Sequence, residues 1–154
     1  MRRATRADRP AIEAFLNARA VTSMFPLSNL ALHGMDGEHG RSMSFWLVED
    51  DDGLTDIIAS TRDGMVMPSC DTGPWDAAGS ALAGTDVIGV IGAKNQARPL
   101  IAALGLEGVT TELDEDEPQF ILSLSDLTVP EGPGELLPLS QVDRAEMVNW
   151  RRLY

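Results

Sequence analysis

The chain is short of cysteine, of positive charge and of long apolar runs, and each shortage excludes a class of protein. Its one cysteine, Cys70, cannot form an internal disulfide, which fits a reducing cytosol. Lys and Arg number 12 against 24 Asp and Glu, so the net charge is −12. This charge argues against nucleic acid as a partner, because such binding neutralises phosphates with basic residues. No run reaches the roughly 18 apolar residues of a membrane-spanning helix, and the segment after Arg3 lacks the apolar core of a signal peptide. We therefore expect a soluble, cytoplasmic protein that does not bind membranes.

Hydrophobic residues make up 44% of the chain, enough for a globular core, and 154 residues suit one domain better than two. The clearest pattern covers residues 86–106. Residues 86–91 are a short β-branched run that predicts a buried strand. Ala97, Leu100 and Leu104 then recur at helical spacing, and Gly105 follows where a helix needs a left-handed residue. A strand, a turn and a helix in this order indicate part of an α/β unit.

The rest of the first 127 residues predicts a mixed fold. The expected helices cover residues 9–20, behind Asp8 as N-cap, 28–33 and 75–82. The further expected strands cover residues 2–7, 43–49, 54–61, 65–68, 109–112 and 120–124. Residues 34–42 hold three glycines and predict a flexible loop without a core residue. The predicted fold class is therefore α/β (α+β), a mixed, mostly antiparallel central sheet with helices on both faces.

The C-terminal part of the chain predicts a linker followed by a second strand–cap–helix pattern like that of the N-terminus. Residues 128–134 contain two prolines and two glycines, which is typical of a linker. Residues 136–154 share the design of residues 1–19, and aligning the two superposes Asp8 on Asp143 and Phe15 on Trp150. A duplication and an ordinary strand–cap–helix start both explain this match. Under the duplication, residues 1–127 are one domain and residues 135–154 begin a truncated second copy.

This element order resembles the Gcn5-related N-acetyltransferase (GNAT) family, in particular the degenerate N-terminal half of its tandem members. The resemblance covers about residues 1–127, and its best local matches are RRATRAD before an amphipathic helix and NQARPLIAALGL at 95–106. It implies that acetyl-CoA lies where the fourth strand splays from the fifth, with its pantetheine paired to the fourth strand. It also implies that amides of a glycine-rich, basic loop and the next helix N-terminus hold the pyrophosphate. A tyrosine on the following helix would protonate the leaving thiolate after acetyl transfer to an amine.

The sequence departs from the family pattern at the residues that perform this chemistry. The expected fourth strand is followed by the loop SCDTGPWD at 69–76, which has one glycine and no Lys or Arg. Asp71 would repel a phosphate, and Pro74 removes an amide donor. Ile101 stands where the resemblance places the tyrosine. We therefore expect no catalytic residue in this chain and no bound acetyl-CoA. If a ligand does bind, it would be lined by Met67, Ser69, Gly73 and Trp75.

Two other clusters have a functional and a structural interpretation. His33 and His39, with acidic residues between them, suggest a metal site, but the CxxC or HExxH spacing of known sites is missing and we expect no metal. Gly89 and Gly92 ahead of Lys94 suggest a phosphate cradle, yet close packing at a βα turn explains them better.

Cys70 and the acidic runs are also ambiguous. Cys70 lies near an expected helix N-terminus that could activate a thiol, but an inert thiol is the simpler reading. The acidic runs at 49–52 and 112–117 are expected to be solvated loops, with attraction of a cationic amine as the alternative.

Three functions remain open. The first is a non-catalytic GNAT-like half of a putative acetyltransferase, whose partner is the missing C-terminal half of the same protein and which could form homo-oligomers. The second is a stand-alone acyltransferase with an atypical CoA loop. The third is a binding module for a small ligand or a protein. We favour the first.

Overall fold

The computed structural model describes residues 1–128, 132 and 137–153. Contacts divide the chain into two compact units, Met1–Gln119 and Phe120–Tyr154. Most of the expected linker at 128–134 and the first residues of the expected second copy lie outside the described residues. No helix in the described ranges is long and apolar enough to cross a membrane.

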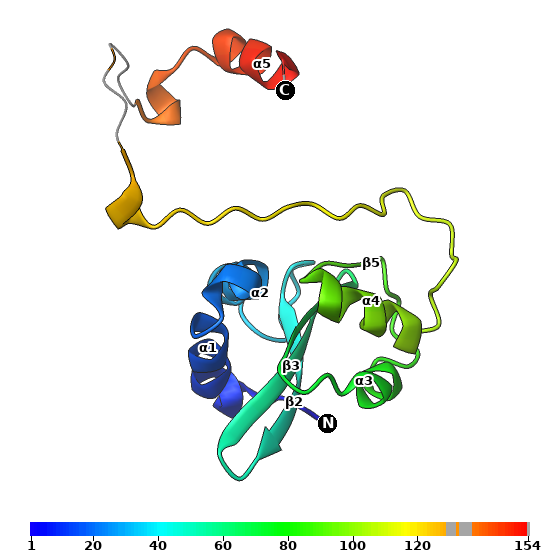
Figure 1. The fold of residues 1–154 in the computed structure, drawn as a ribbon. Coiled ribbons are helices and arrows are strands. Elements are labelled where there is room, and N and C mark those ends of the chain that lie inside the picture. The colour runs from blue at the N-terminus through cyan, green and yellow to red at the C-terminus, as the bar shows by residue number, and fades with distance from the viewer. Residues whose placement is uncertain (129–131, 133–136, 154) are drawn as a thin grey trace. The chain divides into compact units, whose positions relative to one another are not determined.

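The first unit is built on a mostly antiparallel sheet (Figure 1). Its strands are β1 (Arg2–Arg3), β2 (Met43–Asp50), β3 (Gly53–Thr61), β4 (Met65–Cys70) and β5 (Gly89–Val90), and they lie side by side in chain order. The first three pairings are antiparallel and the last, between β4 and β5, is parallel. Gly64 makes the last pairing feasible, because its φ is +94° and a β-carbon there would collide with the carbonyl oxygen of Asp86. The antiparallel pairing of β2 with β3 and of β3 with β4 confirms the predicted meander.

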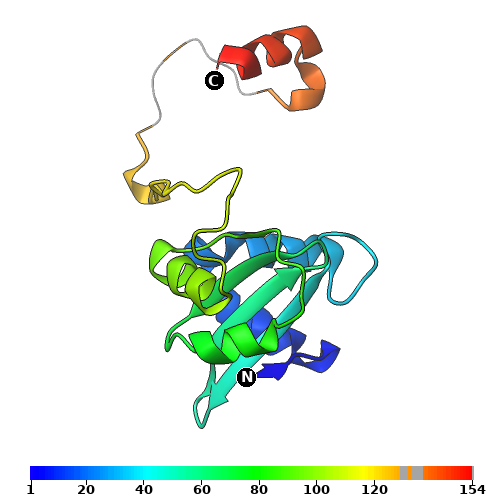
Figure 2. The same ribbon diagram turned by 90° about the vertical axis from the view of Figure 1, so that its right-hand side faces the viewer.

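Four helices of the first unit cover the two faces of the sheet (Figures 1 and 2). They are α1 (Arg9–Asn17), α2 (Ala20–His33), α3 (Trp75–Ala81) and α4 (Lys94–Ala103). The sheet separates two cores because side chains alternate along β3. Ile57 and Ala59 join the core with α1 and α2, whereas Ile58 joins the core with α3 and α4. The structure thus confirms a mixed α and β fold with helices on both faces.

The two strands expected at 109–112 and 120–124 are wrong, since neither segment pairs with the sheet. A β-prone run becomes a strand only beside a partner, and the sheet ends at β5, which offers two residues. The strand expected at 86–91 is shorter than predicted, because only the two residues of β5 pair with β4. Instead, the acidic residues that follow 109–112 contact α4. Asp116 lies 2.5 Å from Lys94 and Asp114 lies 2.6 Å from Arg98.

Residues 34–42 do contain core residues, contrary to the prediction. Met35 is buried in the core beneath α1 and α2, and it bridges to Met43 at the start of β2. Gly34, with a φ of +68°, turns the chain after α2 so that Met35 points inward. The first glycine of this segment thus positions a buried methionine.

The bounds of the N-terminal elements differ from the prediction. β1 ends at Arg3 because the next residues form a 3₁₀ turn, Arg6–Asp8. Asp8 precedes α1 as predicted, but its carboxylate does not cap that helix. It accepts hydrogen bonds from Arg2 at 2.8 Å and from the amide of Thr5 at 2.7 Å. The helices expected at 9–20 and 28–33 are α1 and α2, and α2 begins earlier, at Ala20, with a kink at Ser23.

The second unit contains 3₁₀ turns at Leu124–Asp126 and Leu139–Gln141 and the helix α5 (Arg144–Leu153). Asp143 caps α5 as predicted, because its carboxylate accepts the amides of Ala145 at 2.9 Å and Glu146 at 3.0 Å. Residues 137–138 form no strand. The duplication therefore stays a hypothesis.

Candidate functional site

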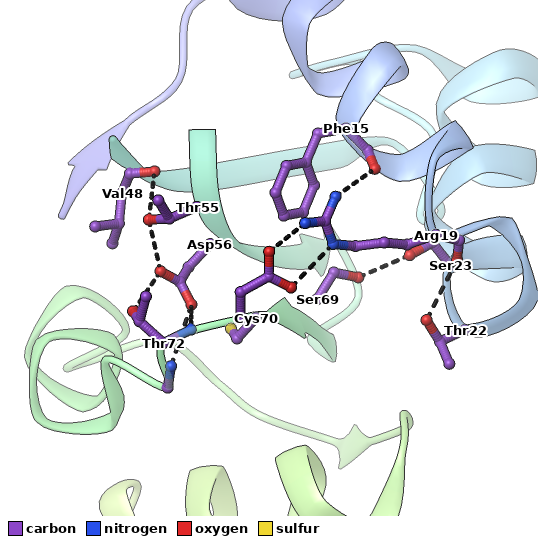
Figure 3. A network of polar contacts seen from close by, with 12 residues as sticks. Phe15, Arg19, Thr22, Ser23, Val48, Thr55, Asp56, Ser69, Cys70 and Thr72 are labelled. Carbon is purple, nitrogen blue, oxygen red and sulfur yellow. Dashed lines mark hydrogen bonds and ion pairs between the residues drawn. The ribbon is translucent and has the colours of Figure 1, made fainter. Parts of the chain in front are cut away.

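The four residues predicted to line a ligand do not come together. Met67 is buried in the core beneath α1 and α2. Ser69 is buried on the same side of the sheet, where its Oγ lies 3.0 Å from the Oγ of Ser23 on α2 (Figure 3). Trp75 instead packs against the core beneath α3 and α4, and Gly73 lies two residues before it with a φ of +70°. The sheet thus separates Met67 and Ser69 from Trp75.

A buried carboxylate occupies the loop between β4 and α3. Asp56, on β3, is fully buried. One of its oxygens accepts the backbone amides of Thr72 at 2.8 Å and Gly73 at 3.2 Å. Its other oxygen accepts the hydroxyls of Thr72 at 2.6 Å and Thr55 at 2.8 Å (Figure 3). Consecutive amides that converge on one point form an anion-binding nest, and here the anion is a side chain of the protein itself.

These hydrogen bonds keep Asp56 ionised. Burial alone would raise the pKa of the carboxyl group, because the charged form loses its hydration. The hydroxyls of Thr72 and Thr55 and the amides of Thr72 and Gly73 stabilise the anion, and their combined effect sets the pKa of Asp56 below its usual value. The nest therefore holds a permanent negative charge at neutral pH.

The edge of β4 that faces β5 is also occupied. Beyond Val66 the two strands no longer pair. Pro68 has no amide hydrogen to offer. Cys70, two residues on, donates its amide to the side chain of Gln96 at 3.1 Å and accepts a hydrogen bond from the same side chain at 3.1 Å. The carboxamide of Gln96, from α4, thus takes the place of a neighbouring strand.

Arg19 supplies a positive charge near this loop, but it is engaged. Its guanidinium lies 3.7 Å from the ring centroid of Phe15 and donates to the carbonyl oxygen of that residue at 3.2 Å (Figure 3). It also forms a two-point ion pair with Asp71. Asp71, expected to repel a phosphate, therefore neutralises the cation closest to it in the fold.

The remaining candidates have structural roles. Cys70 is buried, and desolvation together with the charge of Asp56 raises the pKa of its thiol to about 12. Both support the prediction of an inert thiol. A β-carbon on Gly89 would lie 3.1 Å from the sulfur of Met65, and one on Gly92 would lie 3.2 Å from the ring of Pro68. These glycines permit close packing, as expected.

His33 and His39 do meet in the fold. Their rings stack in parallel with centroids 3.9 Å apart. Within the described residues, no group of three or more His, Cys, Asp or Glu side chains gathers around a point where a metal could sit.

Sequence reasoning did not find Asp56 or Gln96. A charged residue inside the apolar strand LTDIIAST was a signal, since a buried charge needs partners. Gln96 gave none, because a polar residue in the first turn of a helix is ordinary.

In comparisons with known proteins, no family model, no curated protein and no solved structure matched the chain. The chemistry of the arrangement therefore rests on its geometry. The amides of Thr72, Gly73 and Cys70 are satisfied by side chains of the protein itself.

Proposed function

We propose that residues 1–119 are a degenerate GNAT-like domain that binds no coenzyme and serves as a scaffold for an acetyl-transferring half of a longer protein. The proposal is supported by the order of the elements, by helices on both faces and by the change from antiparallel to parallel pairing at β4 and β5. One observation carries it. The amides of Thr72 and Gly73, in the loop that the resemblance equates with the pyrophosphate loop, bind the carboxylate of Asp56.

The occupied edge of β4 supports the same proposal. A pantetheine chain would need backbone donors and acceptors along this strand. Pro68 lacks the donor and Gln96 uses both groups of Cys70. In the whole protein, acetyl would pass from acetyl-CoA to an amine through residues outside this chain, and this domain would contribute a wall of the substrate cleft or a dimer surface.

A thermal melt of the chain with about 1 mM acetyl-CoA tests the proposal. A ligand present at about 100 times its dissociation constant stabilises a protein by about 2.7 kcal/mol, which would raise the midpoint by roughly 5–10 °C for a chain of this size. We expect no shift. A clear shift would contradict the proposal and support the alternative of a stand-alone acyltransferase with an atypical loop. Whether the natural reading frame continues past Tyr154 into a second domain is the companion test.

A small-ligand module is the other candidate. A groove of about 270 Å³ lies between the C-terminal ends of α3 and α4, where Leu82, Val87 and Leu104 line it, and a wider, open hollow of about 540 Å³ lies along α4 at Lys94 and Arg98. Typical ligand pockets exceed about 300 Å³ and enclose most of the ligand with several convergent polar groups. The groove is too small for this and the hollow is too open. We therefore rank this function second. A fragment screen by NMR whose shifts gather at this groove would favour it.

A further inference from the structure

The acidic run at 112–117 and the two residues after it form an anchored segment, which we call the acidic strap (residues 112–119). The first half of the strap contacts α4. Asp114 lies 2.6 Å from the guanidinium of Arg98, and Asp116 lies 3.2 Å from the same group. Asp116 also lies 2.5 Å from the ammonium group of Lys94. These ion pairs hold the first half of the strap on α4.

The end of the strap contacts α2. The side-chain amide of Gln119 donates to the carbonyl oxygen of Val21 at 2.6 Å. Both helices also touch the C-terminal end of β4, α2 through Ser23 and α4 through Gln96. The strap therefore links, within the first unit, the two helices that flank the end of β4. The run expected to be a solvated loop is thus held at both ends.

The position of the strap depends on the two cations of α4. Five of the six residues at 112–117 are Asp or Glu, and Lys94 is the only lysine of the chain. The chain as a whole has a net charge of −12. Without Lys94 and Arg98, the surrounding protein would therefore repel the strap.

The contacts of the strap are individually weak and act together. Exposed ion pairs contribute little, because water and salt compete for both charges. Lys94 is 69% exposed and Asp116 is 46% exposed. Arg98 contacts both aspartates, however, and Gln119 holds the far end, so the strap closes as a unit. Together these contacts favour the closed strap by about tenfold. A balance this small shifts readily with ionic strength.

We propose that the acidic strap is an electrostatic latch, which closes across the C-terminal end of β4 through its ion pairs with α4 and opens as the ionic strength rises. The inference is independent of the proposed acetyltransferase-like role. The closed strap occupies Lys94 and Arg98 and ties α4 to α2. The open strap releases both cations and removes this tie, so access to this end of the sheet depends on the state of the strap.

Cleavage by a glutamate-specific protease tests the proposal, because Glu115 lies between the two anchoring aspartates. A segment that must open before it is cut is protected in proportion to its closed population. At about 0.1 M salt, where charges beyond about 10 Å are already screened, cleavage after Glu115 should be about tenfold slower in the full chain than in a free peptide of residues 110–122. At about 1 M salt, which screens the contacts themselves, the difference should fall below about threefold.

Two double variants separate the ion pairs from the overall charge of the strap. Asp114→Asn with Asp116→Asn removes the anchoring carboxylates, and its cleavage should lie within about twofold of its own peptide at both salt concentrations. Glu112→Gln with Glu117→Gln is the matched control, because it removes the same charge but none of the four contacts. It should keep the protection of the wild type. Wild-type cleavage as fast as that of the peptide at about 0.1 M salt, or protection that neither salt nor loss of the two aspartates reduces, overturns the proposal.

Lys94 provides a second measurement that needs no protease. Reductive methylation with isotope-labelled formaldehyde labels this one lysine, besides the terminal amine of Met1, and keeps its charge. The methyl NMR signal of Lys94 should move as the salt rises from about 0.1 M to 1 M in the wild type. In the Asp114→Asn, Asp116→Asn variant it should lie at the high-salt position throughout. An identical Lys94 signal in the two proteins at every salt concentration would show that the strap does not close on α4 and would overturn the latch.

Discussion

Replacing Asp56 should destabilise the first unit in a graded way. In Asp56→Ala the amides of Thr72 and Gly73, in a loop that is only partly buried, lose their acceptor. A fully buried donor left without a partner costs about 1–3 kcal/mol, so roughly 2–6 kcal/mol is the upper limit for these two, because water can reach them in part. The hydroxyls of Thr72 and Thr55 can rotate, and Thr55 already lies 3.4 Å from the carbonyl oxygen of Val48. Removing a desolvated charge offsets part of the loss. We expect Asp56→Ala to lower the free energy of unfolding by about 3 kcal/mol.

Asp56→Asn is the matched control for the charge. Its amide oxygen can still accept the two backbone amides, and the threonine hydroxyls can turn to accept from its NH₂ group. The expected loss is about 1 kcal/mol, the difference between a charge-assisted and a neutral hydrogen bond. Urea unfolding followed by circular dichroism measures both variants. At a slope of about 1.5 kcal/mol per molar, the midpoint of Asp56→Ala should fall by roughly 2 M. An unfolding midpoint of Asp56→Ala within about 0.5 M of the wild-type midpoint would refute the reasoning, because such a difference is close to the error of about 10–15%. A midpoint of Asp56→Asn as low as that of Asp56→Ala would refute it as well.

The pH dependence of this difference is a further check. The pKa of Asp56 is lowered on folding, so the folded state holds the carboxylate more firmly than the unfolded state does. Its contribution is present above the unfolded pKa of about 3.9 and is lost as the pH falls through the folded pKa. The stability gap between wild type and Asp56→Asn should be constant above about pH 5 and shrink at lower pH.

Three shorter predictions concern neighbouring residues. Gln96→Ala should cost about 1–2 kcal/mol and speed exchange of the Cys70 amide, whereas Asn95→Ala, at an exposed position, should do neither. Cys70 should not react with a thiol reagent at pH 8 until the protein unfolds, and rapid reaction in the native state would contradict its burial. The pKa of His33 is lowered, chiefly by desolvation and then by the charges of His39 and Arg41. The unfolded state then takes up the proton first, and stability should fall as the pH drops below about 6.5 in wild type but less in His33→Asn.

The parts of the fold that the sequence predicted are those in which neighbouring residues decide the structure. The meander followed from alternating side chains and turn glycines, and α4 followed from Leu100 and its helical neighbours. The segment 109–112 failed because strand formation depends on a distant edge that is not written into the segment. Met35 failed for a related reason. Its burial depends on the turn at Gly34 and on β2, which begins eight residues later.

For the candidate site, the sequence predicted only which binding groups the loop lacks. The loop at 69–76 reads as unfit for a phosphate from Asp71 and Pro74 alone. Asp56, which binds the amides of the loop, comes from β3, and Gln96, which binds the edge of β4, comes from α4. Both contacts join residues remote in sequence, and a polar side chain in a single sequence does not identify a distant partner.

Under the proposed function, the inability to bind acetyl-CoA would not depend on one residue. Asp56→Ala would empty the nest of Thr72 and Gly73, yet Asp71 would still occupy the guanidinium of Arg19, the cation near this loop. Gln96 would still occupy the backbone of Cys70, and Pro68 would still lack its amide. Each of these obstacles acts on a different part of an acetyl-CoA molecule, so removing one restores one contact. We therefore expect Asp56→Ala to show no thermal shift with about 1 mM acetyl-CoA. Such a result would distinguish a site closed throughout from an active site blocked by a single carboxylate.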